Sequence, residues 1–475
     1  MIKILRNSIL FFALCLFSIS IYYNDLNILL ISIFILFIHN IIFFLANIQE
    51  RVIFGAFHVT FFTFLLGNLA FNKLSDESAI IIFSEGVQKH ILITLFISLL
   101  CIFLGYIVST NKGYYSINKT IDYDSNNVRL IRTISKYVYY ISYIPYLICL
   151  LDKVNFVSEN NYISYYTQYT SSIPHVVVSF GQMSIISFAL FLATMPNKKE
   201  SRLPILLYMI YTFLSLGYGQ RNTFVLNLLF IFIYFIVRNK INPGRKKWLE
   251  KKHVILIMIA TPFIIVSLNN FAFTRENKMV EETSRGEVIT DFFVGQGQSI
   301  NIIGYGKSLE NTFPPNKMYT FGPLIDYMRN NVITQFIFDI PKYKSNTVDM
   351  ALYGNSFGQT ISYLVIKDNY LAGRGMGSCY IAEVYKDFGY IGIVIINLVY
   401  GYFFANINKQ LRYNVWLTAF LLISIKYILL SPRADTLTFL TSSINMINIF
   451  TLGLIWFVYK ILNNRNKIHD NDLKW

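Results

Sequence analysis

Three arginines in this sequence stand in short polar turns beside long apolar segments. Arg221 comes soon after Gly219, Arg275 directly precedes Glu276, and Arg433 directly follows Pro432. A guanidinium donates two parallel hydrogen bonds to a phosphate, so arginines at the edge of an apolar region favour a phosphate-bearing ligand. The alternative is that each arginine contacts lipid headgroups, or that Arg275 pairs with its acidic neighbour.

A glycine-rich turn at 373–378 runs directly into an acidic helix. The turn contains Arg374, and its glycines let backbone N–H groups approach an anion closely. Glu383 and Asp387 are four residues apart and therefore share one helix face. Either acid can act as a general base on a sugar hydroxyl, and we take Glu383 as the candidate. The alternative is an amphipathic interfacial helix in which Lys386 balances the acids.

No cofactor motif accompanies these residues. The sequence has no HExxH, no paired Cys/His spacing, no P-loop and no dinucleotide-binding fingerprint. Three of the four cysteines lie within apolar segments and only Cys379 lies outside one, so no disulfide framework follows. We therefore expect neither a metal nor a nucleotide cofactor.

The composition places these residues in a membrane protein. Apolar residues make up 54% of the 475 residues and charged residues only 14%, whereas a soluble protein has about a quarter charged. Many apolar segments reach about 20 residues, the length that crosses about 30 Å of hydrocarbon. This pattern excludes a soluble globular enzyme.

Hydropathy predicts an all-α integral membrane fold, a polytopic bundle of about 12 transmembrane helices with one large periplasmic loop. We expect short interfacial helices within that loop. The division is an N-terminal bundle of about nine helices at 1–271, the loop at 272–388, and about three helices with a cytoplasmic tail at 389–475. The predicted spans are 8–23, 26–47, 52–71, 90–108, 130–151, 172–195, 203–218, 223–237, 253–271, 389–407, 414–431 and 438–458.

The charge distribution predicts the orientation in a bacterial inner membrane. With 41 basic and 26 acidic residues the net charge is +15, which in a soluble protein can indicate nucleic acid. Here the basic residues gather in alternate loops, as the positive-inside rule requires, and we expect no nucleic-acid partner. The short loops assigned to the outer side hold only Lys73, Lys89, Lys153, Arg221 and Arg433. Both termini are therefore predicted to be cytoplasmic and the large loop periplasmic.

Arginines at one outer face, with little charge inside the bilayer and a long outer loop, indicate a site for an anionic lipid-linked substrate. A polyprenyl pyrophosphate would place its tail between helices and its diphosphate against Arg221, Arg275, Arg374 and Arg433. Its sugars would lie under the loop.

Three patches resemble the O-antigen polymerases, the Wzy-type membrane glycosyltransferases. These are Gly219-Gln220-Arg221-Asn222, the stretch from Gly373-Arg374-Gly375 through Glu383 to Phe388-Gly389-Tyr390-Ile391-Gly392, and Ser431-Pro432-Arg433-Ala434-Asp435. The layout of about a dozen helices with one large loop in the C-terminal half is also similar to that family.

The resemblance implies a block transfer. The growing glycan would leave undecaprenyl pyrophosphate and join a hydroxyl of a new undecaprenyl pyrophosphate-linked repeat unit. It implies substrate binding by Arg221, Arg275 and Arg433, a Wzz-type chain-length regulator as partner, and no metal.

Three other functions stay open at this point. An O-antigen ligase shares the helical layout, but the histidine that would favour it is absent from residues 272–388. A lipid-linked oligosaccharide flippase would favour ionisable residues spread through the membrane interior. A polysaccharide acyltransferase would need a histidine-acid motif, and none is convincing here.

Overall fold

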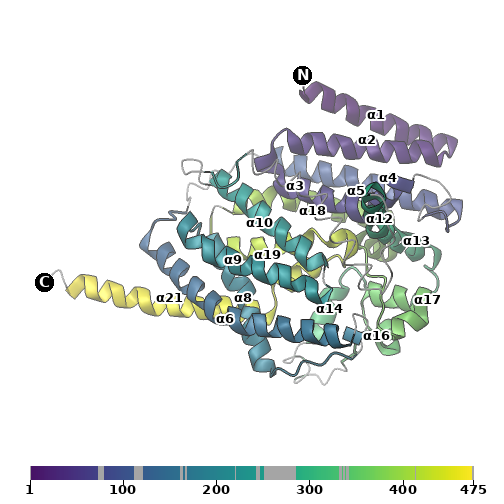
Figure 1. Ribbon diagram of the computed structural model, residues 1–475. Helices are drawn as coiled ribbons and strands as arrows, with labels where there is room; N and C mark the ends of the chain where they lie inside the picture. Colours follow the sequence, from purple (N-terminus) through teal and green to yellow (C-terminus); the bar gives the residue numbers. More distant parts are fainter. Residues whose placement is uncertain are drawn as a thin grey trace. The chain divides into compact units, whose positions relative to one another are not determined.

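The computed structural model describes residues 2–72, 80–111, 121–160, 164–165, 168–219, 221–241, 247–250, 285–330, 334, 337, 342–411 and 413–472. Within these ranges every regular element is a helix (Figure 1). The predicted span 253–271, Arg275 and Gln220 lie outside the described residues. The all-α class is confirmed for the described part of the chain.

Nine helical stretches in the described part of the chain are long and apolar enough to cross a membrane. They match nine predicted spans, and they cover Ile4–Tyr23, Leu26–Leu45, Ile48–Asn72, Glu85–Thr110, Asn126–Glu159, His175–Ala193, Arg221–Ile241, Tyr380–Ile407 and Thr438–Arg465. The predicted spans 203–218 and 414–431 are not among these nine; they fall on α9 (Lys198–Leu214, 17 residues), which a 3-10 turn continues to Tyr218, and on the shorter α19 (Val415–Ile428, 14 residues). A total of about 12 spans stays a prediction.

The described residues form two compact units, and the first is built from 1–114, 251–406 and 428–438. In its N-terminal part α1 packs on α2, and α2 packs on both α3 and α5 (Figure 1). Short helices follow in the region predicted to be a loop, as expected. The helices of the first unit are α1 (Ile2–Tyr23), α2 (Leu26–Leu45), α3 (Ile48–Phe61), α4 (Gly67–Asn72), α5 (Glu85–Asn111), α12 (Arg285–Gly297), α13 (Asn301–Ser308), α14 (Gly322–Arg329), α16 (Val348–Tyr353), α17 (Phe357–Leu371) and most of α18 (Tyr380–Gln410).

The second unit comprises residues 115–250, 407–427 and 439–475. Helix α6 packs along α8, and α21 contacts both (Figure 1). Tyr139, Phe188 and Tyr234 are fully buried in its core. Besides α9 and α19 its helices are α6 (Asn126–Glu159), α8 (His175–Ala193), α10 (Arg221–Ile241), α20 (Thr438–Ser443) and α21 (Met446–Asp472). The predicted division into 1–271, 272–388 and 389–475 separates membrane-spanning parts from a periplasmic loop, so the two compact units do not test it and it stays a prediction.

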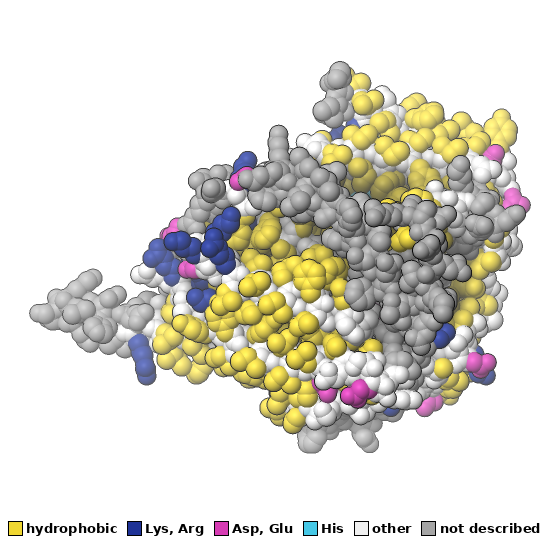
Figure 2. All heavy atoms as spheres, in the orientation of Figure 1, with side chains coloured by type: hydrophobic (Ala, Val, Ile, Leu, Met, Phe, Trp, Pro, Cys, Tyr) yellow, Lys and Arg dark blue, Asp and Glu magenta, His cyan; other side chains and the backbone are white. Residues whose placement is uncertain are grey.

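Basic side chains gather at one end of the second unit, where α6 and α9 begin and α10 ends (Figure 2). Arg132 lies 3.5 Å from Glu200, and Arg238 donates to the carbonyl of Pro196 at 2.6 Å. Exposed apolar side chains cover much of the visible surface beside this basic end (Figure 2). This separation of charge and apolar surface suits a bundle that spans a bilayer.

Helix α18 breaks at Gly389, the residue at which the sequence predicts the tenth span to begin. Gly389 has φ 60° and ψ −153°, a conformation that is essentially restricted to glycine. The break separates the first turns of α18, which carry Glu383, from the apolar remainder. Placing a side chain at this position would cost about 1–3 kcal/mol.

A turn of π-helix interrupts the third candidate span between α3 and α4, at Phe62–Leu66. Such turns are rare and are frequent at functional sites. The glycine after it allows α12 to approach closely, because a Cβ at Gly67 would lie 2.9 Å from the carbonyl oxygen of Phe293. Asn68 also donates to the carbonyl of Val294 at 3.3 Å. This packing brings the end of α12 beside the π-helical turn.

Candidate functional site

The turn that carries Arg433 is fixed to α18. It forms a short 3-10 helix, Ser431–Arg433, whose proline suits the first positions of a helix. The hydroxyl of Tyr400 donates to the carbonyl of Thr436 at 2.7 Å, and it also lies 3.4 Å from the hydroxyl of Ser431. Both ends of the turn are thereby tied to one buried tyrosine, which limits the directions available to the Arg433 side chain.

Glu383 holds the same turn from the other side. Its carboxylate is fully buried, and both the backbone N–H and the hydroxyl of Thr436 donate to Oε2 at 2.7 Å. The hydroxyl of Ser378 donates to Oε1. The carboxylate therefore joins the end of the glycine-rich turn to the arginine turn, and its oxygens are engaged by protein donors.

Arg433 lies where three segments of the first unit meet. Its Nη1 donates to Oε1 of Gln296 at 2.6 Å, and its guanidinium lies 5.6 Å from the ring centre of Phe64. Gln296 belongs to the last turn of α12, and Phe64 belongs to the π-helical turn. An aromatic face and an amide thus orient a half-buried guanidinium, which strengthens its interaction with an anion relative to open water.

Asp435 is a second acid at this place. Its carboxyl contacts that of Glu383, and its Oδ2 lies 3.5 Å from the hydroxyl of Thr438. Asp435 is partly exposed, whereas Glu383 is fully buried. The site therefore has a carboxyl pair with only one accessible member, close in the chain to Arg433.

The glycine-rich turn lies against the arginine turn. Gly377 has φ 83°, the left-handed conformation that glycine adopts without strain, and a Cβ there would lie 3.9 Å from the carbonyl oxygen of Arg433. The N–H of Met376 donates to the hydroxyl of Ser362 at 2.9 Å, which fixes the turn to α17. Arg374 stands earlier on this turn with an exposed side chain.

The first unit therefore contains three of the five predicted site residues: Arg374 and Arg433 lie on two adjoining turns, and Glu383, on α18, joins these turns. Arg221 belongs to the second unit, where it is the first residue of α10, and Gly219 has the left-handed φ of 84°. Arg275 lies outside the described residues. Asp387, the other acid of the predicted face, has a separate task, because it accepts the N–H groups of Tyr319 and Thr320 at 3.2 and 2.6 Å.

Sequence reasoning missed the polar partners that orient the predicted residues. These are Gln296, Ser378 and Thr436, with Phe64 as the aromatic contact. The position of Gln296 between two glycines, Gly295 and Gly297, could have indicated a residue of the site. The others carry no local pattern. Among the described residues no three His, Cys, Asp or Glu side chains form a group that could hold a metal ion.

Comparison with known proteins identifies the family. The family model described as O-antigen polysaccharide polymerase Wzy matches residues 5–466. No curated protein and no solved structure matches the chain. The match covers nearly the whole chain, and it confirms the resemblance drawn from the arginine turns and the helical layout, in preference to ligase, flippase or acyltransferase. The chain belongs to the O-antigen polysaccharide polymerase Wzy family, the membrane polymerases of lipid-linked oligosaccharide repeat units.

Proposed function

We propose that this polymerase acts at the periplasmic face of the inner membrane. It transfers the growing glycan from undecaprenyl pyrophosphate to a hydroxyl of a new undecaprenyl pyrophosphate-linked repeat unit. The observation that carries the proposal is the position of Arg433, oriented by Gln296 and Phe64 beside the accessible acid Asp435. A cation and a carboxylate at one place suit a reaction that releases a diphosphate and takes up a hydroxyl proton.

Arg433 has the role of binding the diphosphate in this reaction. As the bond between the anomeric carbon and the phosphate oxygen breaks, its electron pair goes to the diphosphate and negative charge grows there. A guanidinium already in place stabilises that charge without reorganising. Arg374, exposed on the adjoining turn, extends the same binding surface. Arg221 and Arg275 are proposed to bind the diphosphate as well.

The hydroxyl of the acceptor sugar attacks the anomeric carbon, and its proton goes to the carboxyl pair. Asp435 is the member that a substrate can reach. Glu383 is the candidate base predicted from the sequence. In this reaction it instead interacts with Asp435 and positions the arginine turn through Thr436. The acceptor needs only modest base assistance, since the diphosphate is a good leaving group.

The proposed orientation is supported by the basic residues that gather where α6 and α9 begin and α10 ends, because the positive-inside rule favours the cytoplasm for such an end. We expect an alkaline phosphatase fusion after Lys344 to be active and a green fluorescent protein fusion there to be dark. Fusions at the C-terminus should behave in the opposite way. A phosphatase fusion after Lys344 that is inactive despite normal expression would place the site on the wrong side for this reaction.

Arg221→Ala is expected to shorten or remove the polymer ladder seen on lipopolysaccharide gels. Loss of one phosphate-binding arginine weakens charge stabilisation by about 10²-fold. The measurement is a ladder from cells in which the chromosomal copy is replaced. Arg202→Ala, on the basic end assigned to the cytoplasm, is the matched control and should leave the ladder intact. A normal ladder for Arg221→Ala would remove this residue from the site.

A Wzz-type chain-length regulator is the proposed protein partner, since members of this family work with one. Crosslinking of the two proteins in cells, followed by purification of the polymerase, tests this partnership.

A further inference from the structure

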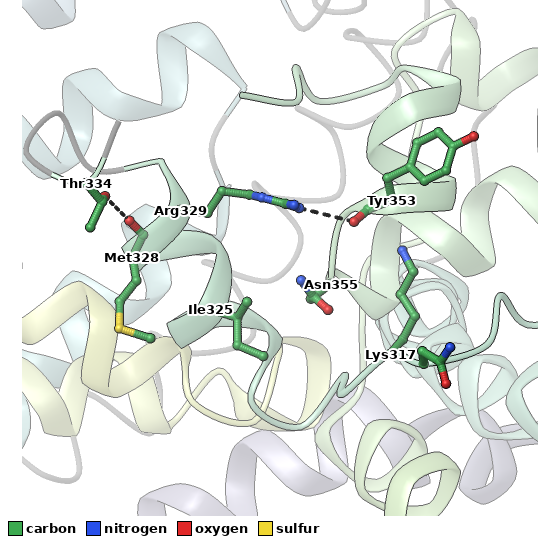
Figure 3. Close-up of a pocket in the computed structure, with 8 residues that line it drawn as sticks. Lys317, Ile325, Met328, Arg329, Thr334, Tyr353 and Asn355 are labelled. Carbon is green, nitrogen blue, oxygen red and sulfur yellow. Dashed lines mark hydrogen bonds between the residues drawn. The ribbon is translucent and has the colours of Figure 1, made fainter. Parts of the chain in front are cut away.

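A hollow of about 520 Å³, whose lining does not include Arg433, lies in the part of the first unit that the sequence predicts to be the periplasmic loop (Figure 3). Its lining includes Lys317, Ile325, Arg329, Tyr353 and Asn355. The volume lies within the range of about 300–1,000 Å³ that small-molecule sites occupy. The reaction proposed above uses none of these residues.

The walls of the hollow are fixed to each other before any ligand arrives. Asp326, on α14, accepts the backbone N–H of Asn355 at 3.2 Å and its side-chain N–H at 3.3 Å. Gly322, at the start of the same helix, allows close approach, because a Cβ there would lie 2.0 Å from the carbonyl oxygen of Asn355. The segment after α16 therefore cannot move away from α14 without breaking several contacts, and the site is preformed.

Two cations reach into this rigid frame. Lys317 donates to the carbonyl of Gly354, and Arg329 donates through Nη1 to the carbonyl of Tyr353 at 3.2 Å. Figure 3 shows both side chains extending toward the segment of Tyr353 and Asn355 from different sides. The backbone carbonyls orient the two charges but do not neutralise them.

The local electrostatics favour an added anion. Burial lowers the pKa of Lys317, the charge of Asp326 opposes this, and the charge of Arg329 lowers the pKa further. The two cations are thus close enough to repel each other. The ion pairs found within the described residues are Arg132–Glu200 and Lys307–Glu310, so neither cation forms one with a described residue. Burial raises the pKa of Asp326, whereas the hydrogen bonds from Asn355 and the charges of Arg329 and Lys317 lower it, so two cations face one acid here.

The remaining lining suits a sugar ring. Tyr353 turns its backbone carbonyl toward Arg329, and Asn355 contributes an amide that can both donate to and accept from hydroxyls (Figure 3). Ile325 and Met328 supply the apolar floor. Apolar walls with a few fixed polar groups are the usual composition of a small-molecule site.

We propose that this hollow binds a carboxylate-bearing sugar of the lipid-linked glycan, with the carboxylate between Lys317 and Arg329 and the ring against Ile325 and Met328. The inference rests on the proposed function, because it requires this segment and the glycan to be on the same side of the membrane. It makes the polymerase selective for acidic repeat units through a subsite separate from the diphosphate site.

Binding to the purified full-length protein in nanodiscs tests the proposal. The probes are a soluble tetrasaccharide that contains one glucuronic acid and the same tetrasaccharide with that carboxyl reduced to an alcohol. We expect the acidic probe to bind more than about tenfold tighter, since each charge-assisted hydrogen bond contributes that order of affinity. Excess glycerol phosphate should displace it only weakly. Equal affinities of the two sugars, or displacement by glycerol phosphate at equal concentration, would overturn the proposal.

The double variant Lys317→Met/Arg329→Gln should lose the preference for the acidic probe. Lys367→Met, an exposed lysine on α17 outside the hollow, is the matched control and should keep it. A double variant that stays monodisperse and retains the preference would also overturn the assignment. The wild-type comparison does not depend on the folding of any variant. A ladder that survives Arg433→Ala would contradict the proposed function instead, so the two failures are distinguishable.

Discussion

Cells that carry Arg433→Ala should make lipopolysaccharide without a polymer ladder, leaving core and core with a single repeat unit. The guanidinium is oriented by Gln296 and Phe64 before substrate binds, so alanine removes a preorganised donor at the leaving group. Loss of one such donor typically costs about 10²–10³ in rate. The readout is a silver-stained gel together with an immunoblot that verifies normal protein level in the membrane.

Two further variants separate charge from geometry. Arg433→Lys keeps a cation but loses the planar fork that matches a phosphate, and we expect a weak ladder of short chains. Lys344→Ala changes a positive charge in the same unit outside the site, and its ladder should be normal. A full-length ladder in Arg433→Ala at normal protein level would exclude this arginine from diphosphate binding.

The sequence predicts the helical architecture well where the chemistry is local. Apolar length alone locates nine candidate spans, but the tenth predicted span, 389–407, starts too late, because helix α18 begins at Tyr380 and only breaks at Gly389. The start was misjudged at 203–218, because the helix there begins earlier, at Lys198 after the Asn197 cap with its Glu200 partner, and a 3-10 turn continues it from Leu214 to Tyr218. The capping residues determine where this helix starts, and a hydropathy profile does not take capping into account.

The site is less predictable because its geometry depends on residues far apart in the chain. The local sequence of the proline turn and the glycine-rich turn was enough to predict Arg433 and Arg374 as substrate-binding residues. Nothing local indicates that Gln296, 137 residues earlier, bonds to Arg433. Spacing correctly places Glu383 and Asp387 near one helix face, but it cannot say that one carboxylate is engaged by Thr436, 53 residues later, and the other by Thr320. Burial and partner identity are properties of tertiary packing.

The carboxyl pair gives the second large expected effect, because its two members should respond in opposite ways to conservative replacement. Asp435→Asn removes the accessible proton acceptor and should lower the polymerisation rate by about 10²–10⁴, the usual contribution of a general base. The thermal stability of the purified protein should stay unchanged, since Asp435 is partly exposed. The rate is measured with purified protein in nanodiscs and the lipid-linked repeat unit from a strain that lacks the polymerase.

Glu383→Gln should retain most of the activity. Glutamine keeps an oxygen to accept the N–H and hydroxyl of Thr436, and its amide can donate to the hydroxyl of Ser378, which can act as an acceptor. Glu383→Ala instead leaves the buried N–H of Thr436 without a partner, which costs about 1–3 kcal/mol, and it releases the turn that aims Arg433. We therefore expect the alanine variant to lose both the ladder and thermal stability.

The comparison of these variants decides which acid takes the proton. If Glu383 were the base, the glutamine variant would be as inactive as Asp435→Asn is expected to be while remaining stable, and the Asp435 variant would be active. If Glu383 positions the turn, only its alanine variant fails, and it fails together with stability. On this proposal the buried acid, with both oxygens engaged by the protein, holds the arginine turn in place, whereas the partly exposed Asp435 is the acid expected to meet the substrate.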